Sequence, residues 1–255
     1  MLTKKKRAYF IIPALLLVVA VIALVFTQSE KGIEQISNVR MGYDFPVALS
    51  ISEMTENAQV VVIGKYSNYD SSWNMARNPS NISYEDSENF TEGHLYAFTV
   101  EEVLKGEVSE LDILVNHRYS EILKIMESNA EVSNEGIILK EATKENELRL
   151  TVHDPLYISP ELGVSYILFL MKDEVFGYYY GAIEPFSIII SSDSTVVLRS
   201  NLINRTHSFE ESVVVNDNRT INVSISGASI EDNISNTSVD TVLQQIERSV
   251  RKDGR

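Results

Sequence analysis

The chain has 255 residues, a formal net charge of −14 and no cysteine. The absence of cysteine excludes disulfides, zinc–thiolate sites and thiol catalysis. Four basic residues and no acidic residue precede Thr27, so the remainder holds 18 basic and 36 acidic residues, a net charge of −18. A surface of this sign repels the phosphate backbone, and we therefore expect no nucleic-acid partner.

A hydrophobic segment near the N-terminus predicts a membrane anchor. Four basic residues at positions 4–7 precede the uncharged run 8–26. As a helix this run would be about 28 Å long, close to the roughly 30 Å hydrocarbon core of a bilayer. The positive-inside rule makes residues 1–7 cytoplasmic, residues 8–27 a single transmembrane helix and the remainder extracytoplasmic. Small secreted animal domains usually contain disulfides, so the absence of cysteine favours a bacterial cell surface. A cleaved signal peptide is the alternative, although its apolar region is usually shorter and no small-x-small cleavage site follows.

A stalk and a short helix are expected next. Residues 28–46 read as the stalk, and Ser50 with Glu53 three positions later forms the capping box of a helix. The segment 58–66 (AQVVVIGKY) is β-branched and apolar on both faces, which predicts a buried central strand. The polar segment 67–92, rich in Ser and Asn, is interpreted as a long loop.

Short apolar or alternating segments then recur between polar turns, a pattern typical of a β-sandwich or barrel. The expected strands are residues 94–104, 111–117, 136–141, 147–153, 165–171, 175–182, 186–191 and 195–198. The segments 136–141 and 147–153 are expected to pair as a hairpin. Residues 118–135 begin with a patch at helical spacing, and a helix is expected there.

The C-terminal part divides into two segments. Residues 201–237 are rich in Asn and Ser, with weak strand patterns at 213–215 and 221–225. Residues 238–255 predict an amphipathic helix whose apolar residues share one face. We expect this face to pack on the barrel, with a partner-binding helix as the alternative.

Three segments carry a family resemblance: NAQVVVIGK at 57–65, YAFTVEEVLKG at 96–106 and PELGVSYILFL at 160–170. In this order they resemble the netrin-like domain of tissue inhibitors of metalloproteinases, and cysteine-free exported bacterial proteins with the same elements. The resemblance covers residues 47–200 and implies a five-stranded OB-like β-barrel with flanking short helices. It does not carry over protease inhibition, because that family uses an N-terminal cysteine on the protease zinc.

Aromatic residues are the candidates for ligand binding. OB-type barrels bind oligosaccharides on their strands and adjacent loops, and Trp73, Tyr178, Tyr179 and Tyr180 supply rings that can stack on sugars. The alternative is that these rings pack within the barrel wall as cross-strand pairs.

Histidines are the candidates for a metal site. His94, His117 and His153 lie at the ends of expected strands, and strand ends can meet in a barrel. Their sequence spacing matches no metal motif, so no cofactor is expected.

Motifs for catalysis are absent from the sequence. It contains no G-x-S-x-G elbow, P-loop or G-x-G-x-x-G fingerprint. We therefore expect a membrane-anchored extracytoplasmic binding module for an unknown protein or envelope component, without catalysis. An exported hydrolase with a carboxylate or histidine site, and a structural or sensory surface domain, are the alternatives.

Overall fold

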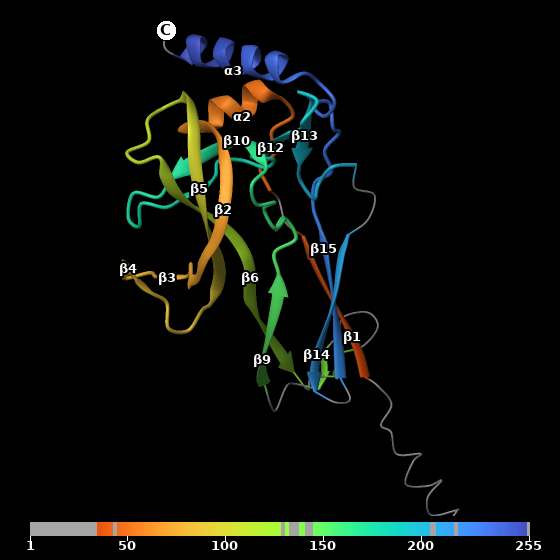
Figure 1. Ribbon diagram of the computed structural model, residues 1–255. Coiled ribbons are helices and arrows are strands. Elements are labelled where there is room, and N and C mark those ends of the chain that lie inside the picture. Colours follow the sequence, from red (N-terminus) through yellow and green to blue (C-terminus); the bar gives the residue numbers. More distant parts are fainter. Residues whose placement is uncertain are drawn as a thin grey trace, which may run out of the picture. The chain divides into compact units, whose positions relative to one another are not determined.

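The computed structural model describes residues 35–42, 45–128, 131–132, 138–140, 145–204, 208–216 and 219–253. Within these residues the protein is mainly β, with two helices (Figure 1). No helix in the described ranges is long and apolar enough to cross a membrane. The predicted anchor, residues 8–27, lies outside them and stays a prediction.

The chain divides into two compact units. One comprises residues 1–37 and 214–221, of which the structure describes only short strand ends. The other comprises residues 38–213 and 222–255, and contains the barrel and both helices.

Five strands form a closed β-barrel. They are β2 (Val60–Asn74), β5 (Thr91–Lys105), β6 (Asp112–Ser128), β10 (Ser165–Lys172) and β11 (Tyr179–Gly181). The order is β11-β6-β5-β2-β10, and pairing of β10 with β11 closes the ring. All these pairings are antiparallel except that of β11 with β6. Four register shifts interrupt the β2–β5 ladder, and such bulges bend and twist long strands.

Further strands extend the sheets. β12 (Ser187–Ile190) pairs with β10, β13 (Val196–Arg199) with β12, and β9 (Glu145–His153) with β6. Three small sheets are separate from this one. The first contains β1 (Gln35–Gly42), β14 (Phe209–Asn216) and β15 (Arg219–Ser226) in the order β1-β15-β14. The other two each have two strands: β3 (Arg77–Asn78) with β4 (Asn81–Glu85), and β7 (Glu131–Val132) with β8 (Ile138–Lys140).

β10 and the first half of β2 are buried on both faces, because a hydrophobic core lies against each face. Inside the barrel, Val62, Phe98 and Leu168 belong to one cluster. On the outer face, Val61 and Phe169 pack in a second cluster with the two helices. This arrangement confirms the expectation that the segment beginning at Ala58 is a strand buried on both faces.

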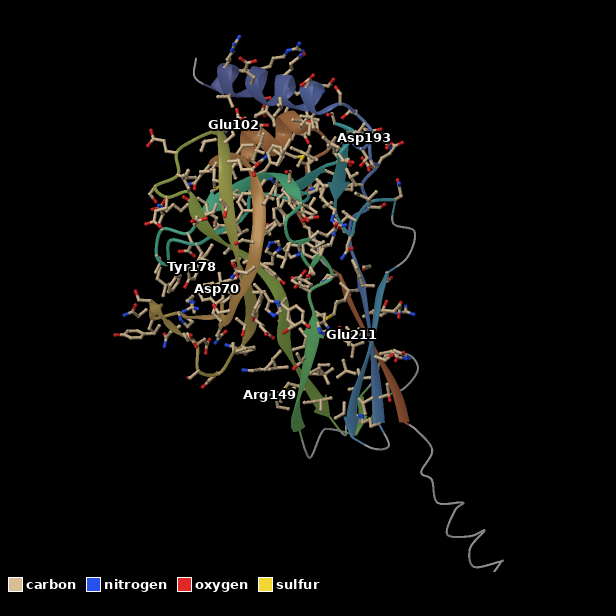
Figure 2. The ribbon with its side chains drawn as sticks, viewed as in Figure 1. Asp70, Glu102, Arg149, Tyr178, Asp193 and Glu211 are labelled. Atoms are coloured by element: carbon tan, nitrogen blue, oxygen red, sulfur yellow. The ribbon has the colours of Figure 1, made fainter. Side chains whose placement is uncertain are left out.

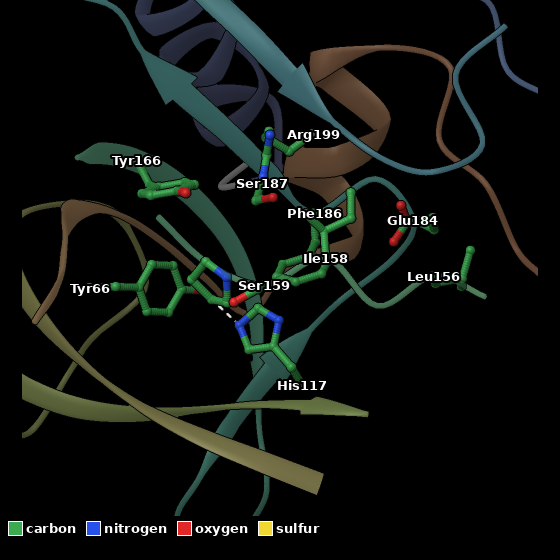
Figure 3. A pocket seen from close by; sticks show the side chains of 11 residues that line it. Tyr66, His117, Leu156, Ile158, Ser159, Tyr166, Glu184, Phe186, Ser187 and Arg199 are labelled. Atoms are coloured by element: carbon green, nitrogen blue, oxygen red, sulfur yellow. Dashed lines mark hydrogen bonds between the residues drawn. The ribbon is translucent and has the colours of Figure 1, made fainter. Parts of the chain in front are cut away.

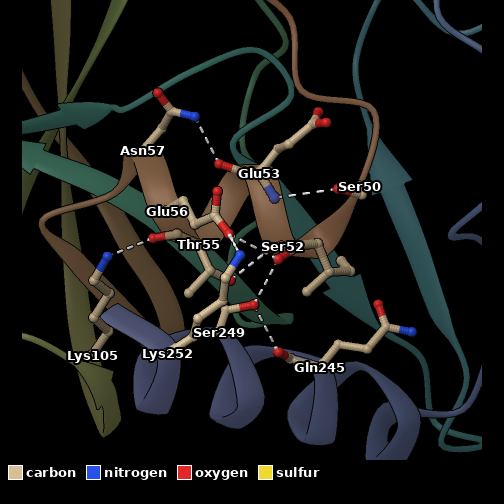
Figure 4. Close-up of polar contacts among 11 residues, drawn as sticks. Ser50, Ser52, Glu53, Thr55, Glu56, Asn57, Lys105, Gln245, Ser249 and Lys252 are labelled. Atoms are coloured by element: carbon tan, nitrogen blue, oxygen red, sulfur yellow. Dashed lines mark hydrogen bonds and ion pairs between the residues drawn. The ribbon is translucent and has the colours of Figure 1, made fainter. Parts of the chain in front are cut away.

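The two helices, α2 (Ile51–Asn57) and α3 (Val239–Asp253), cover the second core. The predicted cap is present, because Ser50 Oγ accepts from the Glu53 backbone N–H at 3.2 Å. Polar contacts join the helices: Ser52 Oγ and Ser249 Oγ are 2.9 Å apart (Figure 4). Val242 and Ile246 of α3 are buried in this core, so the packing expected for the apolar face of α3 is confirmed.

Four expectations from the sequence are wrong. The strand expected at 175–182 is shorter, because a turn precedes it and β11 covers only Tyr179–Gly181. Residues 118–128 are not helical but continue β6, which pairs with β9. The expected hairpin between 136–141 and 147–153 is replaced by this β6–β9 ladder, since β8 pairs with β7. The segment 67–92, expected to be a loop, contains the second half of β2 as well as β3 and β4.

Candidate binding groove

A groove with a volume of about 500 Å³ opens beside β11. This size lies within the range typical of small-molecule sites, about 300–1,000 Å³. Its walls combine aromatic side chains with a few charged groups. The aromatic residues include Trp73, Tyr157, Phe176, Tyr178, Tyr180 and Phe186, and the charged residues are Arg77, Arg118, Asp154, Asp173 and Glu184.

Alternation along β11 decides which tyrosines reach the groove. Tyr178 and Tyr180 line it, whereas Tyr179 between them is buried in the barrel core, because successive strand residues point to opposite faces. Tyr180 is 41% exposed and Tyr179 only 3%. The structure therefore brings Trp73, Tyr178 and Tyr180 together at one groove and places Tyr179 elsewhere. The side chain of Tyr178 is labelled in Figure 2.

A tight turn between β10 and β11 positions Phe176 and Tyr178. The Asp173 carboxylate accepts hydrogen bonds from the backbone N–H groups of Val175 and Phe176, at 2.8 and 2.9 Å. Gly177 adopts a φ of 74°, a conformation that glycine takes without steric cost. These contacts fix the turn, so that Phe176 and Tyr178 project towards Trp73.

Trp73 is held at both its edge and its face. Its ring centroid lies 5.2 Å from those of Phe176 and Tyr178, and its Nε1 donates to Asn116 Oδ1 at 2.8 Å. A Cβ at Gly93 would come within 2.6 Å of Trp73 Nε1, so the indole occupies its position only because residue 93 is glycine.

A cation already lies against this aromatic cluster. The Arg77 guanidinium carbon is 4.7 Å from the Trp73 ring centroid and 4.5 Å from that of Phe176. Both distances are within the range of cation–π attraction. The Arg77 side chain also donates to the backbone oxygens of Asn74 and Met75, which holds it in place.

Glu184 is the most perturbed acidic group of the groove. It lines both the groove and an adjoining inner cavity of about 30 Å³ (Figure 3). Burial raises the pKa of Glu184 to about 7; a hydrogen bond with Ser200 opposes this shift, and the charge of Asp154 adds to it. Backbone hydrogen bonds to Pro46 and Ala48 fix the position of the residue.

Asp154 is the second carboxyl group of the groove. Burial raises its pKa, while the hydrogen bond from the Leu156 N–H and the charge of Arg118 lower it. Arg118 Nε lies 3.2 Å from Asp154 Oδ2, and the same guanidinium contacts Glu121 at 2.6 Å. Arg118 is thus shared between two carboxylates.

Two groups that line the inner cavity, His117 and Tyr66, are uncharged at neutral pH. His117 Nε2 and the Tyr66 hydroxyl are hydrogen-bonded at 3.0 Å. Burial, with a smaller effect of His94, lowers the pKa of His117 to about 3, and burial raises the pKa of the Tyr66 phenol well above its usual range. Arg199, which also lines the cavity, is charged and lies 3.2 Å from Glu161. The cavity has room for an ordered water.

The three candidate metal ligands have different hydrogen-bond partners. His94 contacts Glu92 and Tyr157, at 3.1 and 3.3 Å. His153 contacts Glu211 and Tyr119, at 2.6 and 3.2 Å. In the part of the chain that the structure describes, no group of three or more His, Asp or Glu side chains is arranged to hold a metal ion. His94, His117 and His153 therefore do not assemble into such a group.

Sequence reasoning did not identify Arg77, Asp154 or Glu184 as groove residues. Arg77 lies in a segment interpreted as a loop, and Asp154 precedes a proline that marks only a turn. No spacing rule connects Glu184 with Trp73, because only closure of the barrel brings β2 and the segment after β11 together.

A scan of the sequence against models of known protein families finds no match, and a search of curated proteins finds no significantly similar sequence. The closed barrel is established by strand pairing alone, and the netrin-like resemblance stays a prediction.

Proposed function

We propose that the protein is an extracytoplasmic β-barrel binding module that residues 8–27 anchor in the membrane. Its groove beside β11 binds a component of the cell envelope. The observation that carries the proposal is the groove of about 500 Å³, in which Trp73, Tyr178 and Tyr180 meet beside a few polar groups. Aromatic walls with few, well-placed polar groups are typical of ligand sites. The net charge of −18 after Thr27 disfavours nucleic acid as the ligand.

The barrel is further proposed to be OB-like and related to netrin-like domains. The order of its elements supports this interpretation: a short helix, α2, precedes β2, and β5 ends at Lys105 before a turn at Gly106. Gly106 has a φ of 74°, and a Cβ there would lie 2.3 Å from the Gln59 backbone oxygen. The geometry of this turn therefore requires a glycine. This gives a physical reason for the Lys105-Gly106 pair that ends the second resembling segment, YAFTVEEVLKG.

The single tryptophan provides a direct test. Trp73 is the only tryptophan of the chain and lies in the groove, so its fluorescence reports on groove occupancy. Full-length protein in a non-ionic detergent would be titrated with soluble glycan and peptide fractions of a bacterial cell envelope. We expect a saturable change in Trp73 emission with one class of fraction, and at least tenfold weaker binding for Tyr180→Ala.

Tyr84→Ala is the matched control, because Tyr84 is 66% exposed and does not line the groove. It should bind like the wild-type protein. The proposal is abandoned if no fraction changes the emission, or if Tyr180→Ala binds every active fraction as well as the wild type.

A hydrolase is the second candidate, favoured by one observation. Asp154 and Glu184 line the same groove. Burial, with a smaller contribution from the charge of Asp154, raises the pKa of Glu184 to about 7, in the range of a general acid. Glycoside hydrolysis uses two carboxyl groups, one of them with a raised pKa. Incubation of oligosaccharides with wild type and Glu184→Gln distinguishes the two candidates. Release of reducing ends by the wild type alone would favour hydrolysis over binding.

A further inference from the structure

Glu184 is a partly buried carboxyl group in the wall of a groove that also carries aromatic rings and four other charged side chains. The effects that set its pKa are burial, Ser200 and Asp154, and none of these supplies a positive charge. A carboxylate removed from water is costly unless a cation is paired with it. A ligand with a positive charge at this wall would therefore form an ion pair with the Glu184 carboxylate.

The basic groups around Glu184 are already engaged. Arg118 of β6 pairs with Asp154 and Glu121, and Arg199 of β13 pairs with Glu161. Arg77 lies against Trp73 and Phe176.

The other titratable groups that line the groove and the inner cavity add no positive charge near neutral pH. His117 of β6 is uncharged there because its pKa is about 3, and Tyr66 and Tyr157 have raised pKa values. Asp173, in the turn before β11, is an acidic residue that accepts backbone hydrogen bonds from Val175 and Phe176.

The aromatic wall has the chemistry to hold such a cation. Arg77 shows that the faces of Trp73 and Phe176 accept a guanidinium, at 4.7 and 4.5 Å. Tyr178 and Tyr180 add two further rings along the groove, and Tyr180 is partly exposed. Aromatic faces combined with an anionic group are the arrangement by which proteins recognise organic ammonium ions.

We propose that the groove binds an organic ammonium group, held against Tyr178 and Tyr180 with Glu184 as its counter-ion. This inference rests on the proposed function, because it names the ligand chemistry of the same groove. Below neutral pH, Glu184 releases its proton to solvent as the ammonium group enters, and the complex holds a carboxylate–ammonium pair. Affinity then rises with pH up to about 7, by as much as tenfold per pH unit.

The test compares choline with its neutral carbon isostere, 3,3-dimethylbutan-1-ol, on the full-length protein in a non-ionic detergent at about pH 6, below the folded pKa of Glu184. Trp73 emission gives the affinity, and calorimetry in two buffers of different ionisation enthalpy gives the protons released. We expect choline to bind at least tenfold more tightly than the isostere and to release close to one proton. Glu184→Gln should weaken choline at least tenfold and abolish the release, without changing the affinity for the isostere.

Two further variants keep the result interpretable. Tyr180→Ala removes a partly exposed ring and should weaken choline, so the proposal remains testable if Glu184→Gln fails to fold. Glu102→Gln changes an exposed residue of β5 (Figure 2) and should bind choline as the wild type does.

Each contrary result has a defined meaning. Equal binding of choline and its isostere overturns the ammonium proposal but leaves the groove as a ligand site. An absence of choline binding, or unchanged choline binding by Glu184→Gln, overturns it as well. The envelope-fraction titration with Tyr180→Ala decides separately whether the groove binds a ligand at all.

Discussion

Replacement of Glu184 by glutamine should change how the stability of the protein depends on pH. In the folded protein the pKa of Glu184 rises from 4.5 to about 7, mainly through burial. Its contribution to stability is therefore fully present below pH 4.5 and is lost as the pH rises through about 7. At roughly 1.4 kcal/mol per pKa unit, ionisation of this buried group costs the wild-type protein about 3 kcal/mol by about pH 8.5. The glutamine side chain of the variant cannot ionise, so the variant does not bear this cost.

Urea unfolding at about pH 4.5 and about pH 8.5, followed by Trp73 emission, measures the effect. Between about pH 4.5 and about pH 8.5, the unfolding free energy of the wild type should fall by about 3 kcal/mol more than that of Glu184→Gln. With a typical urea slope of about 1–3 kcal/mol/M, the midpoint difference shifts by about 1–3 M. The contribution from His117 is common to both proteins and cancels. Parallel pH profiles for the variant and the wild type would refute the reasoning, and Glu102→Gln should give the wild-type profile.

Three other predictions concern stability. Burial lowers the pKa of His117 from 6.5 to about 3. Its contribution to stability is therefore present above pH 6.5 and is lost as the pH falls towards 3. In His117→Asn, the unfolding free energy measured with urea should fall less steeply over this acidic range. Phe169→Ala should cost about 3–5 kcal/mol in urea unfolding, since Phe169 is fully buried beneath the helices. Ser50→Ala should cost about 1 kcal/mol in thermal unfolding, through loss of the α2 cap; an unchanged midpoint would contradict that role.

The sequence is sufficient to predict the buried half of β2 but not its second half. Residues 60–66 are apolar on both faces, and only a strand between two cores accommodates that pattern. Residues 67–74 are mostly polar and resemble a loop. They remain extended because they pair with β5 from Ala97 to Glu92, a contact that local composition does not encode.

The helical pattern in β6 misleads for a related reason. Ile122, Leu123, Ile125 and Met126 follow helical spacing, but each faces a residue of β9 across an antiparallel ladder. In short apolar segments, spacing alone does not separate the two structures, and tertiary pairing decides between them.

The groove could be predicted only in part, because its residues come together through barrel closure. Aromatic character is enough to single out Trp73, Tyr178 and Tyr180. The groups that give the groove its electrostatics, Arg77 and Glu184, have ordinary sequence surroundings. Burial makes Glu184 distinctive, and burial is a property of the folded chain.

The pairing of α2 with α3 also determines when the second core can be completed during synthesis. Ile51 and Ile246 belong to one core cluster but lie near opposite ends of the described residues. A ribosome adds Ile246 long after the barrel strands, so the outer faces of β2 and β10 have no complete cover until then. A nascent chain that stalls before residue 239 would present Val61 and Phe169 to chaperones and proteases. Completion of this core therefore depends on the last helix of the chain to be synthesised among the described residues.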